Sequence, residues 1–217
     1  MDNLRDYINT KRRDFKNAPM VETYLPSDPY ELFKKWMQDA IDAESPDPYA
    51  MNVATATIGG RPRTRVVYLR DFTKDGFIFY TNYNSKKGKD LKKNPYAAAN
   101  FFWVELDRQI IIEASVVKVD EATSDAYFKS RPRESQLGAW SSVQSEKLAN
   151  REELEKRLVF YTEKYKDIEV PRPPHWGGFL LQPSRIEFWQ GRPSRLHDRI
   201  MFQKDSENKW IFYRLSP

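Results

Sequence analysis

The sequence predicts a mainly β protein, an antiparallel barrel with helices packed outside it, formed as a single domain of 217 residues. Many short segments with strand-type alternation follow one another through short turns, and strands do not alternate with helices as they do in parallel sheets. Only 8 glycines are present, which argues against a nucleotide-binding fold built on glycine-rich loops. Hydrophobic residues make up 40% of the chain, enough apolar material for a packed core.

The first elements predicted are an N-terminal arm and an amphipathic helix. Residues 1–25 are charged and weakly amphipathic, so we expect a mobile or partly helical arm. A helix should begin at Asp28, which can cap it, with Pro29 in the first turn and Glu31 reaching back. The apolar residues of this helix recur on one face up to about Ala43: Phe33, Trp36, Met37, Ala40 and Ile41.

A β meander should follow between residues 50 and 119. Its expected strands span 51–57, 64–70, 77–81, 97–104 and 109–119. The lysine-rich segment 85–94 interrupts them and is expected to form a helical turn. The second half of the chain should hold helices at 120–130 and 146–165, then strands at 176–181, 185–190, 200–204 and 210–215.

Composition excludes several functional classes. The chain has no cysteine and only two histidines, so thiolate catalysis and cysteine- or histidine-rich metal sites are not expected. The net charge is +5, but basic and acidic residues are interleaved and only residues 86–93 form a dense basic patch, which argues against nucleic-acid binding. No apolar leader or membrane-spanning segment is apparent, so we expect a cytoplasmic protein.

Cationic and hydroxyl groups suited to phosphate binding occur at expected strand ends. Arg65 and Arg70 flank an apolar strand on opposite faces, while Lys86 and Lys87 follow another strand. Such groups bind phosphate by charge-assisted hydrogen bonds. The pattern alone is equally compatible with solvated surface charge on a basic protein.

Residues 130–136 form a second candidate anion site. Arg131 and Ser135 are four residues apart and can reach one anion, and Tyr127 precedes Arg131 by about one helical turn. An ordinary loop with solvated arginines fits the same spacing.

A third candidate lies near the C-terminus. Arg195, His197 and Arg199 alternate with other residues, so in a strand all three would share one face. An imidazole between two guanidinium groups should have a lowered pKa and act as a neutral hydrogen-bonding or proton-accepting group. A purely structural histidine is the alternative.

These segments carry a resemblance to a known family. The motifs are RVVYL at 65–69, FYTN at 79–82, SRPRESQ at 130–136, GAW at 138–140, FWQG at 188–191 and RLHDR at 195–199. The chain resembles the pyridoxine (pyridoxamine) 5′-phosphate oxidases, which are split-barrel flavoproteins, from about residue 28 to 217 and more loosely in the arm. The last two motifs, close together, are the most specific.

The resemblance implies an FMN-binding split barrel that forms a homodimer, with FMN at the subunit interface. Lys86, Lys87, Gln144 and Ser145 would hold the FMN phosphate, and Gln109, Trp189 and Arg199 would contact the isoalloxazine. The remaining implied FMN contacts are Arg65, Val66, Val67, Tyr68, Leu69, Arg70, Tyr80 and Thr81.

The implied reaction oxidises pyridoxine or pyridoxamine 5′-phosphate to pyridoxal 5′-phosphate, with O2 reoxidising FMN and releasing H2O2. Arg195 and His197 would be the catalytic pair that brackets the pyridine ring, beside Leu196. The substrate phosphate would be bound by Arg70, Tyr127, Arg131 and Ser135, and Arg12 and Phe15 would contact substrate from the arm. No nucleic-acid or membrane partner is implied.

Three residues depart from the family's usual pattern. Arg70 stands where lysine is frequent, Lys86 where arginine is frequent, and Phe15 where tyrosine is usual. Two alternatives remain open: a related split-barrel FMN reductase or oxidase with another substrate, and a non-catalytic protein that binds FMN or pyridoxal phosphate. The phosphate motif at 130–136 argues against the first, and the intact Arg195 and His197 argue against the second.

Overall fold

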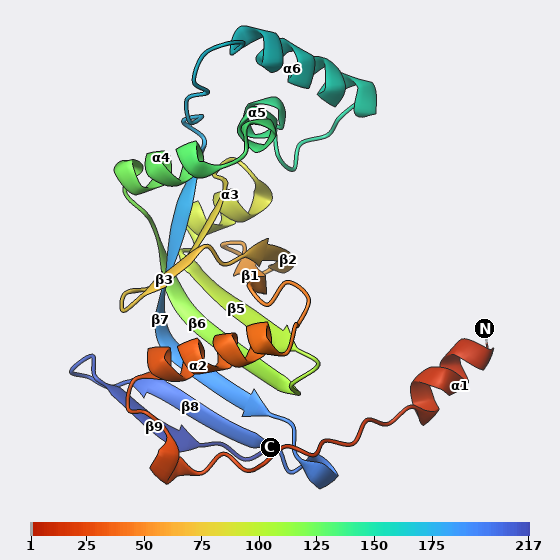
Figure 1. Cartoon of the computed structure of the whole chain (residues 1–217), viewed down its shortest axis with the longest axis vertical. Helices are drawn as coiled ribbons and strands as arrows, with labels where there is room; N and C mark the ends of the chain where they lie inside the picture. Colours follow the sequence, from red (N-terminus) through yellow and green to blue (C-terminus); the bar gives the residue numbers. More distant parts are fainter. Residues whose placement is uncertain (1) are drawn as a thin grey trace. The chain divides into compact units, whose positions relative to one another are not determined.

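A computed structural model describes residues 2–217; Met1, the first residue of the predicted arm, lies outside the described residues (Figure 1). The helices are α1 (Asp2–Thr10), α2 (Pro29–Asp42), α3 (Lys86–Lys93), α4 (Glu121–Ser130), α5 (Arg133–Ser141) and α6 (Arg151–Lys164). The strands are β1 (Ala50–Ala56), β2 (Pro62–Tyr68), β3 (Asp71–Thr73), β4 (Gly76–Asn82), β5 (Tyr96–Trp103), β6 (Arg108–Lys118), β7 (Trp176–Gln190), β8 (Asp198–Lys204) and β9 (Trp210–Arg214).

The strands of the described residues form one sheet with the order β2-β1-β5-β6-β7-β4-β3, and β8 pairs with both β7 and β9. The ladders of β1 with β2 and β5, of β4 with β3 and β7, and of β8 with β7 and β9 are all antiparallel. The predicted antiparallel, mainly β architecture is therefore confirmed.

The chain divides into two compact units, and each draws on separate stretches of sequence. The first unit comprises the described part of Met1–Pro48 together with Phe101–Ile111 and Arg185–Pro217. The second comprises Tyr49–Asn100 and Ile112–Ser184, so β5, β6 and β7 supply residues to both. The single-domain organisation predicted for the chain stays a prediction.

In the first unit, α2 packs its apolar face on aromatic strand residues. Asp28 caps the helix by accepting a hydrogen bond from the Tyr30 backbone N–H at 2.9 Å, as the sequence predicts. Phe33 lies against Phe101 with ring centroids 5.5 Å apart, and Trp36 lies edge-on to Phe188 at 5.2 Å. Each such buried side chain contributes roughly 1.5–3 kcal/mol to stability.

One long strand replaces the two that the sequence predicts at 176–181 and 185–190, so that prediction is wrong. Strand β7 runs without a break, pairing with β4 through residues 176–181 and with β8 through residues 185–190. Residues 182–184, which the prediction left outside both strands, include Pro183, and this proline falls between the two ladders. Its missing N–H therefore removes a hydrogen bond from neither of them.

In the second unit, the helices pack on a separate aromatic cluster. The cluster comprises Phe128, Leu137, Tyr165, Val170 and Trp176. Helix α5 was not predicted; it begins directly after Pro132 and lies beside α6 in Figure 1. Helix α6 starts at Arg151, capped by Asn150, and not at residue 146 as predicted.

Helix α3 confirms the helical turn predicted at 85–94 and sits tightly on the preceding turn. The side chain of Ser85 caps it by accepting from the Gly88 N–H. A Cβ at position 88 would lie 2.1 Å from the Tyr83 carbonyl oxygen, so only glycine permits this approach. This packing places Lys86 and Lys87 at the start of the helix.

Candidate active site

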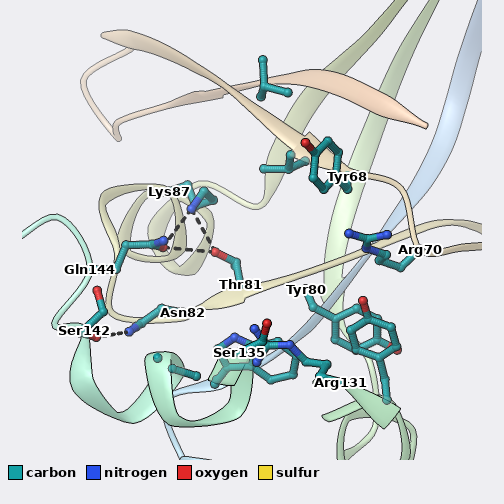
Figure 2. A pocket seen from close by; sticks show the side chains of 16 residues that line it. Tyr68, Arg70, Tyr80, Thr81, Asn82, Lys87, Arg131, Ser135, Ser142 and Gln144 are labelled. Atoms are coloured by element: carbon teal, nitrogen blue, oxygen red, sulfur yellow. Dashed lines mark hydrogen bonds between the residues drawn. The ribbon is translucent and has the colours of Figure 1, made fainter. Parts of the chain in front are cut away.

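Two adjoining hollows in the second unit collect most of the predicted phosphate-binding residues, and Figure 2 shows the first of them. The first, about 490 Å³, is lined by Val66, Val67, Tyr68, Arg70, Tyr80, Thr81, Asn82, Lys87, Tyr127, Arg131, Ser135, Gly138, Ala139, Ser142, Gln144 and Trp176. The second, about 660 Å³, is lined by Arg63, Thr64, Arg65, Val66, Lys86, Lys87, Gln144 and Ser145. They share Val66, Lys87 and Gln144, so the two hollows adjoin, and together they are called the cleft.

The first hollow contains a cation on an aromatic platform. The rings of Tyr80 and Tyr127 stack with centroids 3.8 Å apart and both lie parallel to Trp176. The Arg131 guanidinium lies over Trp176 at 4.5 Å. Its Nη1 is buried and has no hydrogen-bond partner within residues 2–217. An anion in the hollow would satisfy this nitrogen.

The charges around Arg131 favour the same ligand. Burial lowers the pKa of Arg131, and the positive charge of Arg70 lowers it further. Arg70 itself lies over the Tyr68 ring at 5.0 Å. A half-buried cation next to a second positive charge, with Ser135 lining the same hollow, suits a phosphate group.

The two arginines of segment 130–136 have different environments. Arg133 donates hydrogen bonds to the carbonyl oxygens of Tyr165 and Ile168 at 2.5 and 3.0 Å, and so ties α5 to the end of α6. Arg131 is left to the hollow. The segment is a corner between α4 and α5 and not an ordinary loop, with Arg131 half-buried and Arg133 exposed.

The second hollow is organised around Lys87. Its Nζ donates to Thr81 Oγ1 at 2.9 Å and to Gln144 Oε1 at 3.0 Å, as Figure 2 shows. Burial, followed by the charge of Arg65, lowers the pKa of Lys87 to about 8. The adjacent Lys86 backbone N–H donates to Ser145 Oγ at 3.3 Å. In the described part of the chain, Lys87 and Arg65 form no ion pair with a carboxylate.

This donor set fits the phosphate of FMN. Hydroxyl, amide and ammonium groups converge on a hollow whose buried cations lack a full complement of counter-charge, which a phosphate dianion supplies. Of the residues implied to bind FMN, those at positions 65–70, 80, 81, 86, 87, 144 and 145 all belong to the second unit.

The remaining predicted site residues belong to the first unit, where His197 is the central group. The Arg192 backbone N–H donates to His197 Nδ1 at 3.1 Å, so the neutral ring carries its proton on Nε2. Burial, followed by the charge of Arg195, lowers the pKa of His197, as the sequence predicts. The ring lies 4.7 Å from that of Trp189. His197 is thus a neutral donor through Nε2 near pH 7.

The prediction that Arg195, His197 and Arg199 share one strand face is wrong. Strand β8 begins only at Asp198, and residues 193–195 form a 3-10 turn. Ser194 and Arg195 have φ values of 56° and 61°, in the left-handed region that non-glycine residues rarely adopt, so the period-two argument does not apply. Arg195 is exposed and forms no hydrogen bond or ion pair among the described residues. Such backbone strain is frequent at functional sites.

Arg199 is held by an ion pair. Its Nε and Nη2 donate to the two carboxylate oxygens of Glu187 at 2.7 and 2.9 Å, which raises the pKa of Arg199. Trp189 and Arg199 are register partners of β7 and β8. Gln109 lies half-buried on β6.

Within the first unit the arm brings Phe15 to His197. The Phe15 ring lies edge-on to His197 at 5.3 Å and to Trp189 at 5.9 Å. A Cβ at Gly191 would lie 2.6 Å from the Phe15 ring, so the glycine makes room for it. Arg12, by contrast, is exposed, and among residues 2–217 it donates a side-chain hydrogen bond only to the Lys11 carbonyl oxygen.

Seven residues that line the two hollows were not predicted as site residues: Arg63, Thr64, Asn82, Gly138, Ala139, Ser142 and Trp176. Two of them carried a usable signal. Arg63 precedes Arg65 by two residues on a strand, and Asn82 follows Tyr80 by two, so each shares a strand face with a predicted site residue. Ser142 and Trp176 come to the cleft only through the packing of α5 and the start of β7.

Solved structures define the class of protein. The fold matches PhzG from Burkholderia lata 383, solved with tetrahydrophenazine-1-carboxylic acid, at a TM-score of 0.88 and 30% identity over 94% of this chain and 100% of that one. A pyridoxamine 5′-phosphate oxidase-related, FMN binding protein from Nostoc punctiforme matches at a TM-score of 0.70, covering 89% of this chain and 100% of that one. At 14% identity it shows the fold alone. The chain is thus a split-barrel protein, as predicted.

Sequence comparison then defines the family. Residues 37–162 match the family described as pyridoxamine 5′-phosphate oxidase, and residues 176–217 match the pyridoxine 5′-phosphate oxidase C-terminal dimerisation region. The pyridoxine/pyridoxamine 5′-phosphate oxidase of Acaryochloris marina is 48% identical over 100% of this chain and 99% of its own length. The chain belongs to the pyridoxamine 5′-phosphate oxidase family.

No helix formed by residues 2–217 is long and apolar enough to cross a membrane. The cytoplasmic location expected from the sequence stays a prediction.

Proposed function

We propose that the protein is an FMN-dependent oxidase that converts pyridoxine 5′-phosphate and pyridoxamine 5′-phosphate to pyridoxal 5′-phosphate. The observation that carries this proposal is the unpartnered Arg131 Nη1, buried on an aromatic platform within the same cleft as the Lys87 cluster. Two adjoining hollows, each lined by groups suited to phosphate, fit a phosphorylated substrate bound beside a phosphorylated cofactor. Membership of the family, and the names of its curated relatives, support the same activity.

The chemistry that FMN would supply when bound is two-electron oxidation at the substrate C4′ carbon, with O2 as the final acceptor and H2O2 as its product. With the amine substrate, the imine product would take up water and release ammonia to give the aldehyde. The residues of this chain bind and orient. Arg70, Tyr127, Arg131 and Ser135 would hold the substrate phosphate at one end of the cleft, which fixes the position of the pyridine ring.

Lys86, Lys87, Gln144 and Ser145 would hold the cofactor phosphate at the other end. The replacements of lysine by Arg70 and of arginine by Lys86 keep the charge at both ends. The remaining cofactor contacts would be made by Gln109, Trp189 and Arg199.

Arg195 and His197 would act on the substrate ring. With Nδ1 occupied by the Arg192 N–H, neutral His197 donates from Nε2 to a substrate oxygen or nitrogen. Arg195, which forms no hydrogen bond or ion pair among the described residues, would supply a positive charge and planar donors. We further propose that the protein is a homodimer with FMN at the subunit interface, which the match of residues 176–217 to a dimerisation region supports.

The second candidate function is oxidation of a phenazine-type substrate, which the 30% identity to PhzG favours. A phenazine-type substrate carries no phosphate, so its site does not need a phosphate-binding arginine. A requirement for Arg131 therefore distinguishes the first candidate function from the second. A non-catalytic protein that binds FMN or pyridoxal phosphate is the third candidate.

The test is to load the purified protein with FMN, mix it aerobically with each phosphorylated vitamer, and follow aldehyde and peroxide. We expect both products in equal amounts and, in Arg131→Leu, a Michaelis constant raised about tenfold or more with FMN still bound. Protein that cannot be loaded with FMN contradicts the proposal. A loaded protein without turnover favours another substrate or the non-catalytic candidate.

A further inference from the structure

Asp90 is a buried carboxylate beside the Lys87 cluster that the proposed function does not use. It lies on α3 and its residue is 5% exposed. Its Oδ1 accepts a hydrogen bond from Arg63 Nη1 at 2.7 Å, and its Oδ2 accepts from Thr55 Oγ1 at 3.0 Å. Thr55 and Arg63 are register partners of β1 and β2, so Asp90 joins α3 to both strands.

The same chain of hydrogen bonds reaches Arg65. Arg65 Nη1 donates to Thr55 Oγ1 at 2.9 Å and to the Val53 carbonyl oxygen at 3.0 Å. Asp90 therefore fixes Arg63 directly and Arg65 through one hydroxyl group. Both arginines line the hollow that Lys86 and Lys87 also line.

The hollow needs such an anchor because its cations repel one another. Burial is the largest cause that lowers the pKa of Arg65; Asp90 raises this pKa and Arg63 lowers it further. Burial, followed by the charge of Arg65, lowers the pKa of Lys87. Without a partner, long arginine side chains would turn away from this repulsion, and ordering them again on binding costs entropy. A buried carboxylate that holds two guanidinium groups at the hollow prepares it for an anion.

We propose that Asp90 is a positioning residue for the cofactor phosphate, holding Arg63 directly and Arg65 through Thr55. This inference rests on the proposed function, in which the FMN phosphate binds in this hollow. Asp90 would not touch the cofactor itself.

Positioning and simple charge make opposite predictions. Removing a negative charge makes the hollow more positive, which by Coulomb attraction alone would strengthen phosphate binding. If Asp90 acts by holding the arginines, its removal weakens phosphate binding in spite of that gain.

The test compares FMN with riboflavin, which lacks the phosphate, by quenching of flavin fluorescence on flavin-free protein. The variants are Asp90→Asn, Thr55→Val and the control Asp125→Asn, which breaks a helix-to-arginine ion pair with Arg172 elsewhere in the same unit. We expect the dissociation constant for FMN to rise about tenfold or more in D90N and less in T55V, with riboflavin within about twofold. D125N should change neither constant.

The ratio of the two constants separates positioning from a loss of folded protein, because misfolding weakens both flavins equally. T55V keeps every charge and serves as the test if D90N does not fold. An unchanged ratio in both variants, or a stronger preference of D90N for FMN, overturns the inference. If the wild-type protein does not prefer FMN over riboflavin, the phosphate site of the proposed function fails, and the inference fails with it.

Discussion

At the scale of single residues, the candidate site contains basic groups whose protonated, positively charged form is disfavoured in the flavin-free protein. The pKa values of Arg131, Lys87 and His197 are all lowered, each with burial as the largest cause. Groups with perturbed pKa values cluster at functional sites. The environments of Arg195, His197 and Lys87 each support a prediction.

Arg195→Leu should abolish most turnover while leaving the flavin bound. Arg195 is exposed and makes no hydrogen bond or ion pair with the described residues, so its loss should not disturb the fold or the cofactor-phosphate cluster. We expect turnover to fall by about a hundredfold or more, whereas the dissociation constant for FMN changes less than threefold. Arg61→Leu, at an exposed arginine between β1 and β2, is the control. Loss of the flavin from R195L would show that its assigned role is wrong.

His197 should titrate below the ordinary histidine value of 6.5, because burial and Arg195 disfavour the imidazolium. The unfolded chain then binds more protons than the folded one as the pH falls through 6.5, so this contribution to stability is present above 6.5 and is lost toward acid. An NMR titration resolves the two histidines, with His175→Gln identifying the signals. In R195L the pKa measured from the His197 signal should rise toward 6.5, because the charge of Arg195 no longer lowers it. A wild-type pKa above 6.5 would contradict the site electrostatics.

Lys87→Met should stabilise the flavin-free protein at pH 7 and weaken FMN binding. Lowering the pKa from 10.5 to about 8 costs the folded state ~3 kcal/mol. Methionine cannot make the two hydrogen bonds of Lys87, and losing them costs roughly 1 kcal/mol each, which offsets part of this gain. A net gain of about 1 kcal/mol raises the unfolding midpoint by roughly 2–4 °C.

The pH dependence of this gain has a definite sign. In wild-type protein the cost of charged Lys87 is fully present below pH 8 and disappears as the pH rises from 8 toward 10.5, so the advantage of K87M should shrink over that range. Thermal unfolding at pH 7 and pH 9.5 measures it. Lys89→Met, at the exposed lysine that pairs with Glu146, is the control. A midpoint of K87M below that of the wild type at pH 7 would exclude the proposed burial cost.

At the scale of elements, sequence patterns predicted most helices and strands but not the irregular joints at the site. Alternation and capping were sufficient for α2 and for the antiparallel strands. Helix α5 was missed because its segment, with few apolar residues, reads as a loop, and β7 was split at residues 182–184, which include Pro183. The turn at 193–195 depends on left-handed backbone conformations at Ser194 and Arg195, and neither residue type predicts such a conformation.

The arm offers an element-scale prediction through Gly191. Alanine at this position would place Cβ 2.6 Å from the Phe15 ring and displace that ring from His197. We expect Gly191→Ala to expose the arm to limited proteolysis and to raise the Michaelis constant for the phosphorylated vitamers about threefold to tenfold, since the arm was predicted to contact substrate. Gly59→Ala, whose Cβ would meet only an ordinary contact at 3.9 Å, is the control. Equal protease resistance in both variants would show that Gly191 does not seat the arm.

At the scale of the whole molecule, the residues implied to bind FMN divide between two compact units, and the match of residues 176–217 to a dimerisation region supports two chains per active protein. The resemblance carried in the sequence motifs named the family correctly. Residue spacing alone left each cationic cluster ambiguous, because solvated charge and a phosphate site have the same pattern until burial and partners are known.

The central claim is that FMN bound to this chain accepts a hydride equivalent from a phosphorylated B6 vitamer. The most direct measurement mixes the FMN-loaded protein with pyridoxine 5′-phosphate in the absence of oxygen and records the flavin absorbance. The account predicts that the flavin is bleached in a single turnover, with one pyridoxal 5′-phosphate formed per flavin, and that its colour returns when oxygen is admitted. A flavin that stays oxidised with both phosphorylated vitamers would contradict it.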